Sequence, residues 1–319
     1  MRVIRFTEQG GPDVLRPADV PEPEPGPGQV RVDLAATGVN FVEVYQREGR
    51  YRVPLPYVPG SEGAGTVSAV GEGVDGLRAG DRVVSLDLEG AYAEQALVDA
   101  DRAVPVPTGV DLDVAAAAFL QGATTHYLLT DAYPVRPGDV VLVHAAAGGM
   151  GLLLTQVATR LGAKVVGTAS TPEKAELAKE AGAVAVVPYA EVATAVDEAT
   201  GGAGVPVVFD GVGRDTFDAS LKALRRRGTL VLFGASSGAV PPFDPMRLQH
   251  EGSLFLTRPA LGHYTADPAE LRRRAQDLFG WLADGLSVHV HDRYPLAEAG
   301  RAHADLEARR TTGKVLLVP

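Results

Sequence analysis

A buried strand, a glycine-rich turn and a helix follow one another in VLVHAAAGGMGLLLTQVA, residues 141–158. Ala146, Gly148 and Gly151 occupy the three positions of the G-x-G-x-x-G pattern, with alanine in the first. Glycine in the second position lets the backbone approach a pyrophosphate, and glycine in the third lets the helix pack on the strand. Set between a strand and a helix, the pattern favours dinucleotide binding over a purely structural turn. The predicted cofactor-binding residues here are Ala147, Gly148, Gly149, Met150 and Gly151.

Strand and helix patterns alternate around this turn. A continuous apolar run, typical of a buried parallel strand, occupies residues 139–145, and further strand patterns occupy residues 164–170, 205–213 and 229–235. Helical patterns lie between them at residues 151–163, 171–183 and 216–228. Thr171 is a predicted N-cap, with Pro172 at the first helical position. This rhythm predicts a Rossmann doubly wound parallel sheet.

The first third of the chain has a different character. Short alternating runs separated by glycine and proline turns occupy residues 30–39, 63–86 and 91–107, which predicts a mainly antiparallel, barrel-like domain. Helical patterns cover residues 111–133, 267–285 and 297–308. The closing GKVLLVP reads as a strand, so we expect the chain to return to its first domain. With 319 residues, two domains are expected.

Composition excludes several classes of function. The net charge is −10, which disfavours nucleic acid and acidic membranes as partners, since both require a basic surface. The chain has no cysteine, and therefore no disulfide, thiol nucleophile or cysteine-bound zinc. No run reaches the ~18 apolar residues that would span a bilayer. The start of the chain lacks the apolar run of a signal peptide, so we expect a cytoplasmic protein.

The end of the second predicted strand of the Rossmann unit selects the nicotinamide cofactor. An NAD site carries an acidic residue here to bind the ribose hydroxyls, whereas residues 168–171 read Thr-Ala-Ser-Thr. Ser170 can donate a hydrogen bond to a 2′-phosphate and Lys174 can pair with it. The pattern therefore predicts NADPH. Taken alone, Lys174 would be read as an exposed helix lysine.

Two other patterns carry less weight. GASSG at residues 234–238 matches the nucleophile elbow of hydrolases, but Val-Pro-Pro follows it where a helix must start. His289 and His291 could share a metal, although a pair of partly exposed histidines is the better interpretation. Asn40 is distinctive in another way, because it is the only asparagine in the chain. It lies near Tyr45 and Tyr51.

Several separated motifs resemble one family. GSEGAGTVSAVGEGVDGLRAGDRVV, residues 60–84, resembles the signature of medium-chain dehydrogenases/reductases. HAAAGGMG and FDGVGRDTFDASLKALRRRG resemble its zinc-free NADPH:quinone oxidoreductase, or zeta-crystallin-like, branch. The resemblance implies a GroES-like catalytic domain formed by residues 1–118 and 262–319, and a Rossmann domain formed by residues 119–261. It also implies a homodimer joined through the Rossmann sheets near residues 252–261.

The resemblance further implies roles for individual residues. Where zinc members of the family carry ligands, this chain has Asn40 and Ser61-Glu62, so a metal-free site is expected. Asn40 is expected beside the nicotinamide, and Tyr45 and Tyr51 are expected around the substrate. The remaining implied cofactor contacts are Thr124 near the nicotinamide, Ser170, Lys174, Tyr189 and Arg309 at the 2′-phosphate, and Gly213, Phe233 and Ser236 in lining loops.

Three functions are compatible with these residues. The first is reduction of a quinone by NADPH, because an electron-poor ring held flat on the nicotinamide needs no metal. Asn40 and the tyrosine hydroxyls would then bind the quinone oxygen. The second is reduction of α,β-unsaturated ketones or aldehydes. The third is NADPH binding without turnover, as in a crystallin-like or RNA-binding protein, and the acidic charge disfavours RNA.

Overall fold

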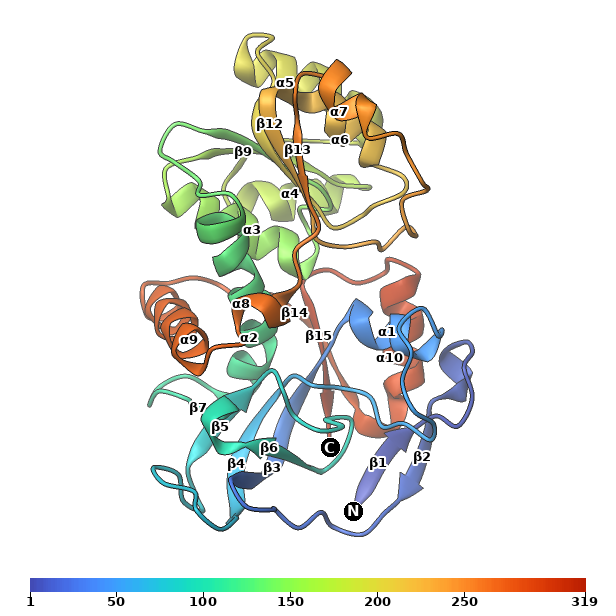
Figure 1. Cartoon of the computed structure of the whole chain (residues 1–319), viewed down its shortest axis with the longest axis vertical. Helices are drawn as coiled ribbons and strands as arrows, with labels where there is room; N and C mark the ends of the chain where they lie inside the picture. Colours follow the sequence, from blue (N-terminus) through green and yellow to red (C-terminus); the bar gives the residue numbers. More distant parts are fainter. The chain divides into compact units, whose positions relative to one another are not determined.

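A computed structural model describes all residues, 1–319, and divides them into two compact units (Figure 1). Unit 1 comprises Met1–Gln121, Leu271–Phe279 and Val288–Pro319. Unit 2 comprises Gly122–Glu270 and Gly280–Ser287. No helix is both long enough and apolar enough to span a membrane.

Unit 2 is built on a six-stranded sheet in the order β10-β9-β8-β11-β12-β13. Every neighbouring pair is parallel, which confirms the predicted doubly wound sheet. Chain order reverses between β8 and β11, so their carboxyl ends flank the switch point where such sheets bind ligands. The strands are β8 (Val140–Val143), β9 (Lys164–Thr168), β10 (Ala183–Val187), β11 (Val205–Asp210), β12 (Leu224–Leu232) and β13 (Phe255–Thr257).

Helices cover this sheet because each has one apolar face. α3 packs against α4 and against β8–β10, whereas α5 packs against α6. Thr171 caps α4 as predicted, since its hydroxyl accepts a hydrogen bond from the Lys174 amide. The helices are α3 (Gly149–Arg160), α4 (Pro172–Glu180), α5 (Val192–Thr200), α6 (Phe217–Ala223), α7 (Met246–His250) and α8 (Leu261–Tyr264), with a single 3₁₀ turn at Tyr189–Glu191.

One predicted helix of unit 2 is too long. The pattern predicts a helix over 216–228, but α6 ends at Ala223 and β12 begins at Leu224. Leu224 pairs with Val205 of β11, so sheet pairing overrides the helical preference of the arginine run. Arg227 then has a φ of +57°, which no helix continues through.

Unit 1 contains a sheet in the order β14-β15-β3-β4-β5-β7, with β6 also paired to β3. All pairs are antiparallel except β14–β15, which confirms the mainly antiparallel domain. β1 and β2 form a separate antiparallel pair. The strands are β1 (Arg2–Arg5), β2 (Arg16–Asp19), β3 (Gln29–Val39), β4 (Gly63–Val70), β5 (Arg82–Ser85), β6 (Gln95–Asp99), β7 (Val104–Pro105), β14 (Val290–Pro295) and β15 (Lys314–Val318).

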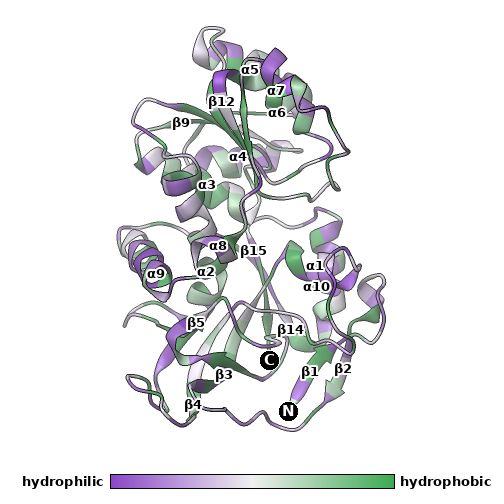
Figure 2. Ribbon diagram, in the orientation of Figure 1, coloured by the Kyte–Doolittle hydropathy of each residue, from purple (hydrophilic) through white to green (hydrophobic).

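The helices complete the chain. α1 (Phe41–Arg47) follows β3, and α10 (Ala299–Glu307) packs on β15. α2 (Leu112–Tyr127) and α9 (Pro268–Ala283) include residues of both units, and α2 continues as a π-helix at Leu128–Ala132. Figure 2 shows hydrophilic and hydrophobic residues alternating along α9, as its amphipathic sequence predicts. Further 3₁₀ turns lie at Pro12–Val14, Ala100–Arg102 and Leu296–Glu298.

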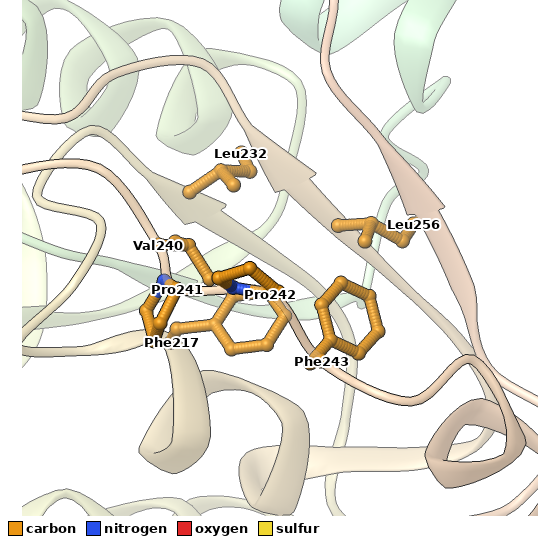
Figure 3. A pocket seen from close by; sticks show the side chains of 7 residues that line it. All are labelled: Phe217, Leu232, Val240, Pro241, Pro242, Phe243 and Leu256. Atoms are coloured by element: carbon orange, nitrogen blue, oxygen red, sulfur yellow. The ribbon is translucent and has the colours of Figure 1, made fainter.

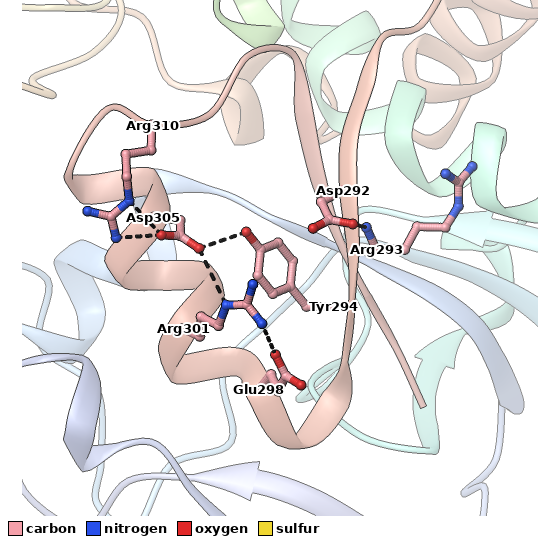
Figure 4. Close-up of polar contacts among 7 residues, drawn as sticks. All are labelled: Asp292, Arg293, Tyr294, Glu298, Arg301, Asp305 and Arg310. Carbon is pink, nitrogen blue, oxygen red and sulfur yellow. Dashed lines mark hydrogen bonds and ion pairs between the residues drawn. The ribbon is translucent and has the colours of Figure 1, made fainter.

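A polar network fastens α10 to β14 (Figure 4). The Tyr294 hydroxyl donates to Asp305 at 2.8 Å, and Arg310 Nε donates to the same carboxylate at 2.7 Å. Arg301 pairs with Glu298 at 2.7 Å and stacks over the Tyr294 ring. Because Tyr294 is buried and its hydroxyl faces a carboxylate, its pKa is raised to about 12.

Candidate functional site

The glycine turn lies at the switch point of unit 2. β8 ends at Val143, Gly148 is the N-cap of α3, and Gly149 and Met150 open the helix. A Cβ on Gly151 would lie 2.3 Å from the Ala145 carbonyl oxygen, so only glycine lets the helix approach the turn this closely. The first-turn amides of α3 have no acceptor within the helix. The turn thus fits a dinucleotide pyrophosphate.

Two further loops meet at the carboxyl edge of the sheet. Gly213 has a φ of +89°, and its amide donates to Asp210 at 3.0 Å. The amides of Phe233 and Ser236 donate to the backbone oxygens of Asp210 and Gly211. The structure therefore joins the predicted residues Gly213, Phe233 and Ser236 in one pair of hydrogen-bonded loops.

The end of β9 carries no acidic residue, as the sequence shows. Ser170 is exposed and Lys174 is half-buried in the first turn of α4. Glu173 is the next acid along the sequence, and its pKa is lowered by hydrogen bonds from its own backbone amide and from Thr171. Tyr189 is half-buried, with its ring edge-on to His144 at 5.8 Å between centroids. Ser170, Tyr189 and Lys174 carry a hydroxyl, a phenol and an ammonium group, and their role at the 2′-phosphate stays a prediction.

Two predicted cofactor residues lie apart from these loops in the sequence. Thr124 is a buried residue of α2 in unit 2. Arg309 is exposed, follows α10 in unit 1, and has a φ of +57°. The roles of Thr124 and Arg309 therefore stay predictions.

Asn40 lies at the start of α1 within a buried charged cluster. Its backbone amide donates to Glu43 at 2.8 Å. Its side-chain Nδ2 donates to Glu62 at 3.0 Å, and its Oδ1 accepts from Lys314 Nζ at 2.6 Å. Lys314 and Glu62 also form a salt bridge of 2.5 Å. Asn40 itself is 9% exposed.

These partners fix the orientation of the Asn40 amide. A flipped amide would turn its N–H groups toward the Lys314 ammonium and its oxygen toward the Glu62 carboxylate, and both contacts would be repulsive. The bond to Glu62 uses one N–H of the Asn40 amide and leaves the second N–H for another acceptor. The ammonium on Oδ1 polarises the amide and makes that N–H a stronger donor.

Sequence reasoning missed Lys314 and Glu43 as members of this cluster. Lys314 begins an otherwise apolar strand, and Glu43 follows Asn40 by three residues, which is the spacing of a capping box. Burial raises the pKa of Glu43 to about 8, and the nearby Lys314 partly offsets this rise. Glu43 is thus protonated at neutral pH.

Tyr45 and Tyr51 lie together in unit 1. Their ring centroids are 5.5 Å apart in an edge-on arrangement, and the Tyr51 amide donates to the Tyr45 carbonyl oxygen. Tyr45 is buried within α1, whereas Tyr51 is 49% exposed. The guanidinium of Arg50 lies 5.3 Å from the Tyr45 ring centre. The structure thus brings the two predicted tyrosines into one aromatic group.

No group of three or more histidine, cysteine, aspartate or glutamate side chains is arranged to hold a metal ion. His289 and His291 instead share the hydroxyl of Thr312, at 3.0 and 3.3 Å. A separate apolar hollow in unit 2 contains none of the predicted site residues (Figure 3). Its lining residues are Phe217, Leu232, Val240, Pro241, Pro242, Phe243 and Leu256.

Two family models match the chain. Residues 26–108 match the alcohol dehydrogenase GroES-like domain, and residues 149–272 match the zinc-binding dehydrogenase model. A quinone oxidoreductase of Pseudomonas aeruginosa is 46% identical, with 99% of each chain covered. The chain belongs to the quinone oxidoreductase branch of the medium-chain dehydrogenases/reductases.

Other members of this family extend the comparison. The solved structure of Escherichia coli quinone oxidoreductase complexed with NADPH is 43% identical, covers 100% of both chains and has a TM-score of 0.98. A 2-haloacrylate reductase of a Burkholderia species is 41% identical, with 98% of this chain and 97% of the relative covered. The family assignment made from sequence motifs is confirmed.

Proposed function

We propose that this protein is an NADPH-dependent quinone oxidoreductase that works without a metal. The main support is the end of β9, where Ser170 and Lys174 stand in place of the acid that an NAD site requires. A full-length relative named quinone oxidoreductase supports the choice of acceptor. A cytoplasmic location is part of this proposal.

The residues of unit 2 hold the cofactor. The first-turn amides of α3 bind the pyrophosphate, and Gly148 lets it approach the backbone. Ser170, Lys174 and Tyr189 bind the 2′-phosphate, Lys174 through its charge and the others through hydroxyl groups. Bound NADPH supplies the reducing equivalents.

The polar residues of unit 1 act on the acceptor. Asn40 donates its remaining N–H to the quinone oxygen, on which negative charge develops during reduction. Tyr45 and Tyr51 shape the acceptor pocket, and the more exposed Tyr51 offers its hydroxyl. A quinone is already electron-poor, so hydrogen bonds can replace the polarising metal of a zinc dehydrogenase.

A substrate panel on metal-stripped enzyme tests this function. Quinones, enones and unsaturated aldehydes are each assayed with NADPH and with NADH, in the presence and absence of a chelator. We expect fast quinone turnover with NADPH that the chelator does not change. Loss of activity with the chelator would refute metal-free reduction, and NADPH binding without any turnover would favour a non-catalytic protein.

Reduction of electron-poor alkenes is the second candidate. The relative named 2-haloacrylate reductase supports it, because a haloacrylate is an electron-poor alkene. Both reactions can use the same cofactor and the same hydrogen bond to an acceptor oxygen. If the enzyme reduces enones or haloacrylates faster than every quinone in the panel, this second function replaces the first.

The edge strand β13 supports a homodimer. It ends the six-stranded sheet, and Phe255 on it is 60% exposed. An exposed apolar edge strand readily pairs with another strand. We assign β13 to pairing with β13 of a second copy, so that the two sheets of unit 2 join.

A further inference from the structure

A chain of buried side chains runs beneath the glycine turn of unit 2. The Ala145 amide donates to Thr168 Oγ1 at 3.0 Å, and the same hydroxyl lies 3.2 Å from His144 Nδ1. His144 Nε2 lies 3.0 Å from Ser220 Oγ, which donates to Asp210 at 2.7 Å. His144 is 2% exposed, and Thr168, Ser220 and Asp210 are fully buried.

Asp210, at one end of this series of hydrogen bonds, fixes which group donates in each of them. Asp210 accepts in every hydrogen bond that it makes, so the single proton of Ser220 points to it. Ser220 Oγ must then accept from His144 Nε2–H. Burial lowers the pKa of His144 and keeps the ring neutral, so Nδ1 accepts from the Thr168 hydroxyl.

Asp210 is a buried carboxylate held by hydrogen bonds from four groups. The amides of Val212 and Gly213 donate to Oδ1 at 2.8 and 3.0 Å, and the Thr216 hydroxyl donates at 2.8 Å to Oδ2. Ser220 is the fourth donor. The chain therefore connects the glycine turn after β8, the end of β9 and the loop after β11.

We propose that Thr168, His144 and Ser220 are positioning residues that set the phosphate-binding turn for NADPH. They act through Ala145, which has a φ of +51°, a conformation that non-glycine residues rarely adopt. The bond from its amide to Thr168 holds this strained turn in place. The first-turn amides of α3 are thereby oriented toward the pyrophosphate. This role rests on the proposed NADPH binding.

Thr168→Val provides the sharpest test. Valine has the shape of threonine but lacks the hydroxyl, so the Ala145 amide loses its acceptor and His144 its donor. We expect the Kd for NADPH, measured by titration of the full-length protein, to rise about tenfold. The kcat at saturating NADPH should stay close to that of the wild type. Thr168→Ser, which keeps the hydroxyl, should restore tight binding, and Ser220→Ala should weaken it.

Thr155→Val is the matched control. Thr155 is a fully buried residue of α3 in the same unit, and its hydroxyl has no hydrogen-bond partner. The control should leave the Kd unchanged. If Thr168→Val lowers only the melting temperature and binds NADPH as the wild type does, the residue is merely structural and the proposal fails. If the wild-type protein does not bind NADPH, the proposed function fails first.

Discussion

At the scale of single residues, Asn40 is held by two opposite charges. Lys314 on its oxygen and Glu62 on its nitrogen leave one oriented N–H. Asn40→Ala should lower kcat for quinone about tenfold or more, because one hydrogen bond to a developing charge is lost. It should also lower the free energy of unfolding by about 1–3 kcal/mol, since both buried partners lose a bond. Steady-state kinetics and urea denaturation measure the two effects.

Thr37→Val separates these two effects. It removes a buried bond from Thr37 Oγ1 to the Ala91 carbonyl oxygen at 2.7 Å, in the same unit. This variant should lose stability and keep its kcat. If Asn40→Ala behaves in the same way, the amide serves the fold and has no part in the reaction.

Lys174 is expected to read the 2′-phosphate. Lys174→Ala should raise the Kd for NADPH about tenfold, because one ion pair to a phosphate is lost, and leave the Kd for NADH unchanged. Lys179→Ala on the same helix is the control, since Lys179 pairs with Glu176 at 2.8 Å and faces solvent. Equal losses for both cofactors would show that Lys174 does not recognise the phosphate.

Sequence reasoning found residues whose signal is local and missed those whose role depends on distant partners. The glycine turn and the Thr171 cap follow from spacing alone. Lys314 contacts residues 40 and 62, which no local pattern in GKVLLVP reveals. The His144 ring likewise gains its partners from one other strand and a helix, Thr168 of β9 and Ser220 of α6.

At the scale of elements, continuous apolar runs predicted the buried strands of unit 2 because helices cover both faces of a parallel sheet. The short helix α1 was not predicted, although Asn40 and Glu43 have capping-box spacing. The helix over 216–228 was predicted too long, because pairing of Leu224 with Val205 is a tertiary effect.

The two edge strands of unit 2 allow a matched test of the proposed dimer. Phe255 on β13 and Val184 on β10 are 60% and 59% exposed, at opposite edges of one sheet. Phe255→Lys should convert the dimer to a monomer in analytical ultracentrifugation, because a charge at the joined edge opposes pairing. Val184→Lys should leave the dimer intact. If only Val184→Lys dissociates the dimer, the interface lies at β10 and its assignment to β13 is wrong.

At the scale of the whole molecule, the return of the last strand to the first domain was predictable because both ends of the chain have strand patterns. The contacts that this return creates were not predictable. Lys314 meets Glu62, and His303 meets Tyr92, both from the first hundred residues of the chain. His303 contacts Tyr92 at 2.9 Å and Arg47 at 3.4 Å. The buried charges of unit 1 thus come from both ends of the chain.

Two buried groups of unit 1, Glu43 and His303, have opposite effects on how stability depends on pH. Burial raises the pKa of Glu43 from 4.5 to about 8, so the folded state keeps a proton that the unfolded state loses, and stability falls as pH rises across this range. Burial and Arg47 lower the pKa of His303 from 6.5 to about 3, so stability falls as pH drops across that range. Within unit 1 the two slopes cancel between pH 4.5 and 6.5, where we expect a plateau.

Single substitutions should remove one slope each. Glu43→Gln keeps an uncharged acceptor for the Asn40 amide, so its free energy of unfolding should no longer decline between pH 6.5 and 8. His303→Gln should make the decline below pH 4.5 shallower and leave the alkaline side as in the wild type. Glu94 and Asp305, whose pKa values are also lowered, carry the rest of the acid decline. Urea denaturation from pH 3.5 to 8.5, followed for each unit because the two can unfold separately, measures both slopes. Glutamine cannot titrate. If the free energy of unfolding of Glu43→Gln still declines between pH 6.5 and 8 as in the wild type, a group other than Glu43 carries the proton.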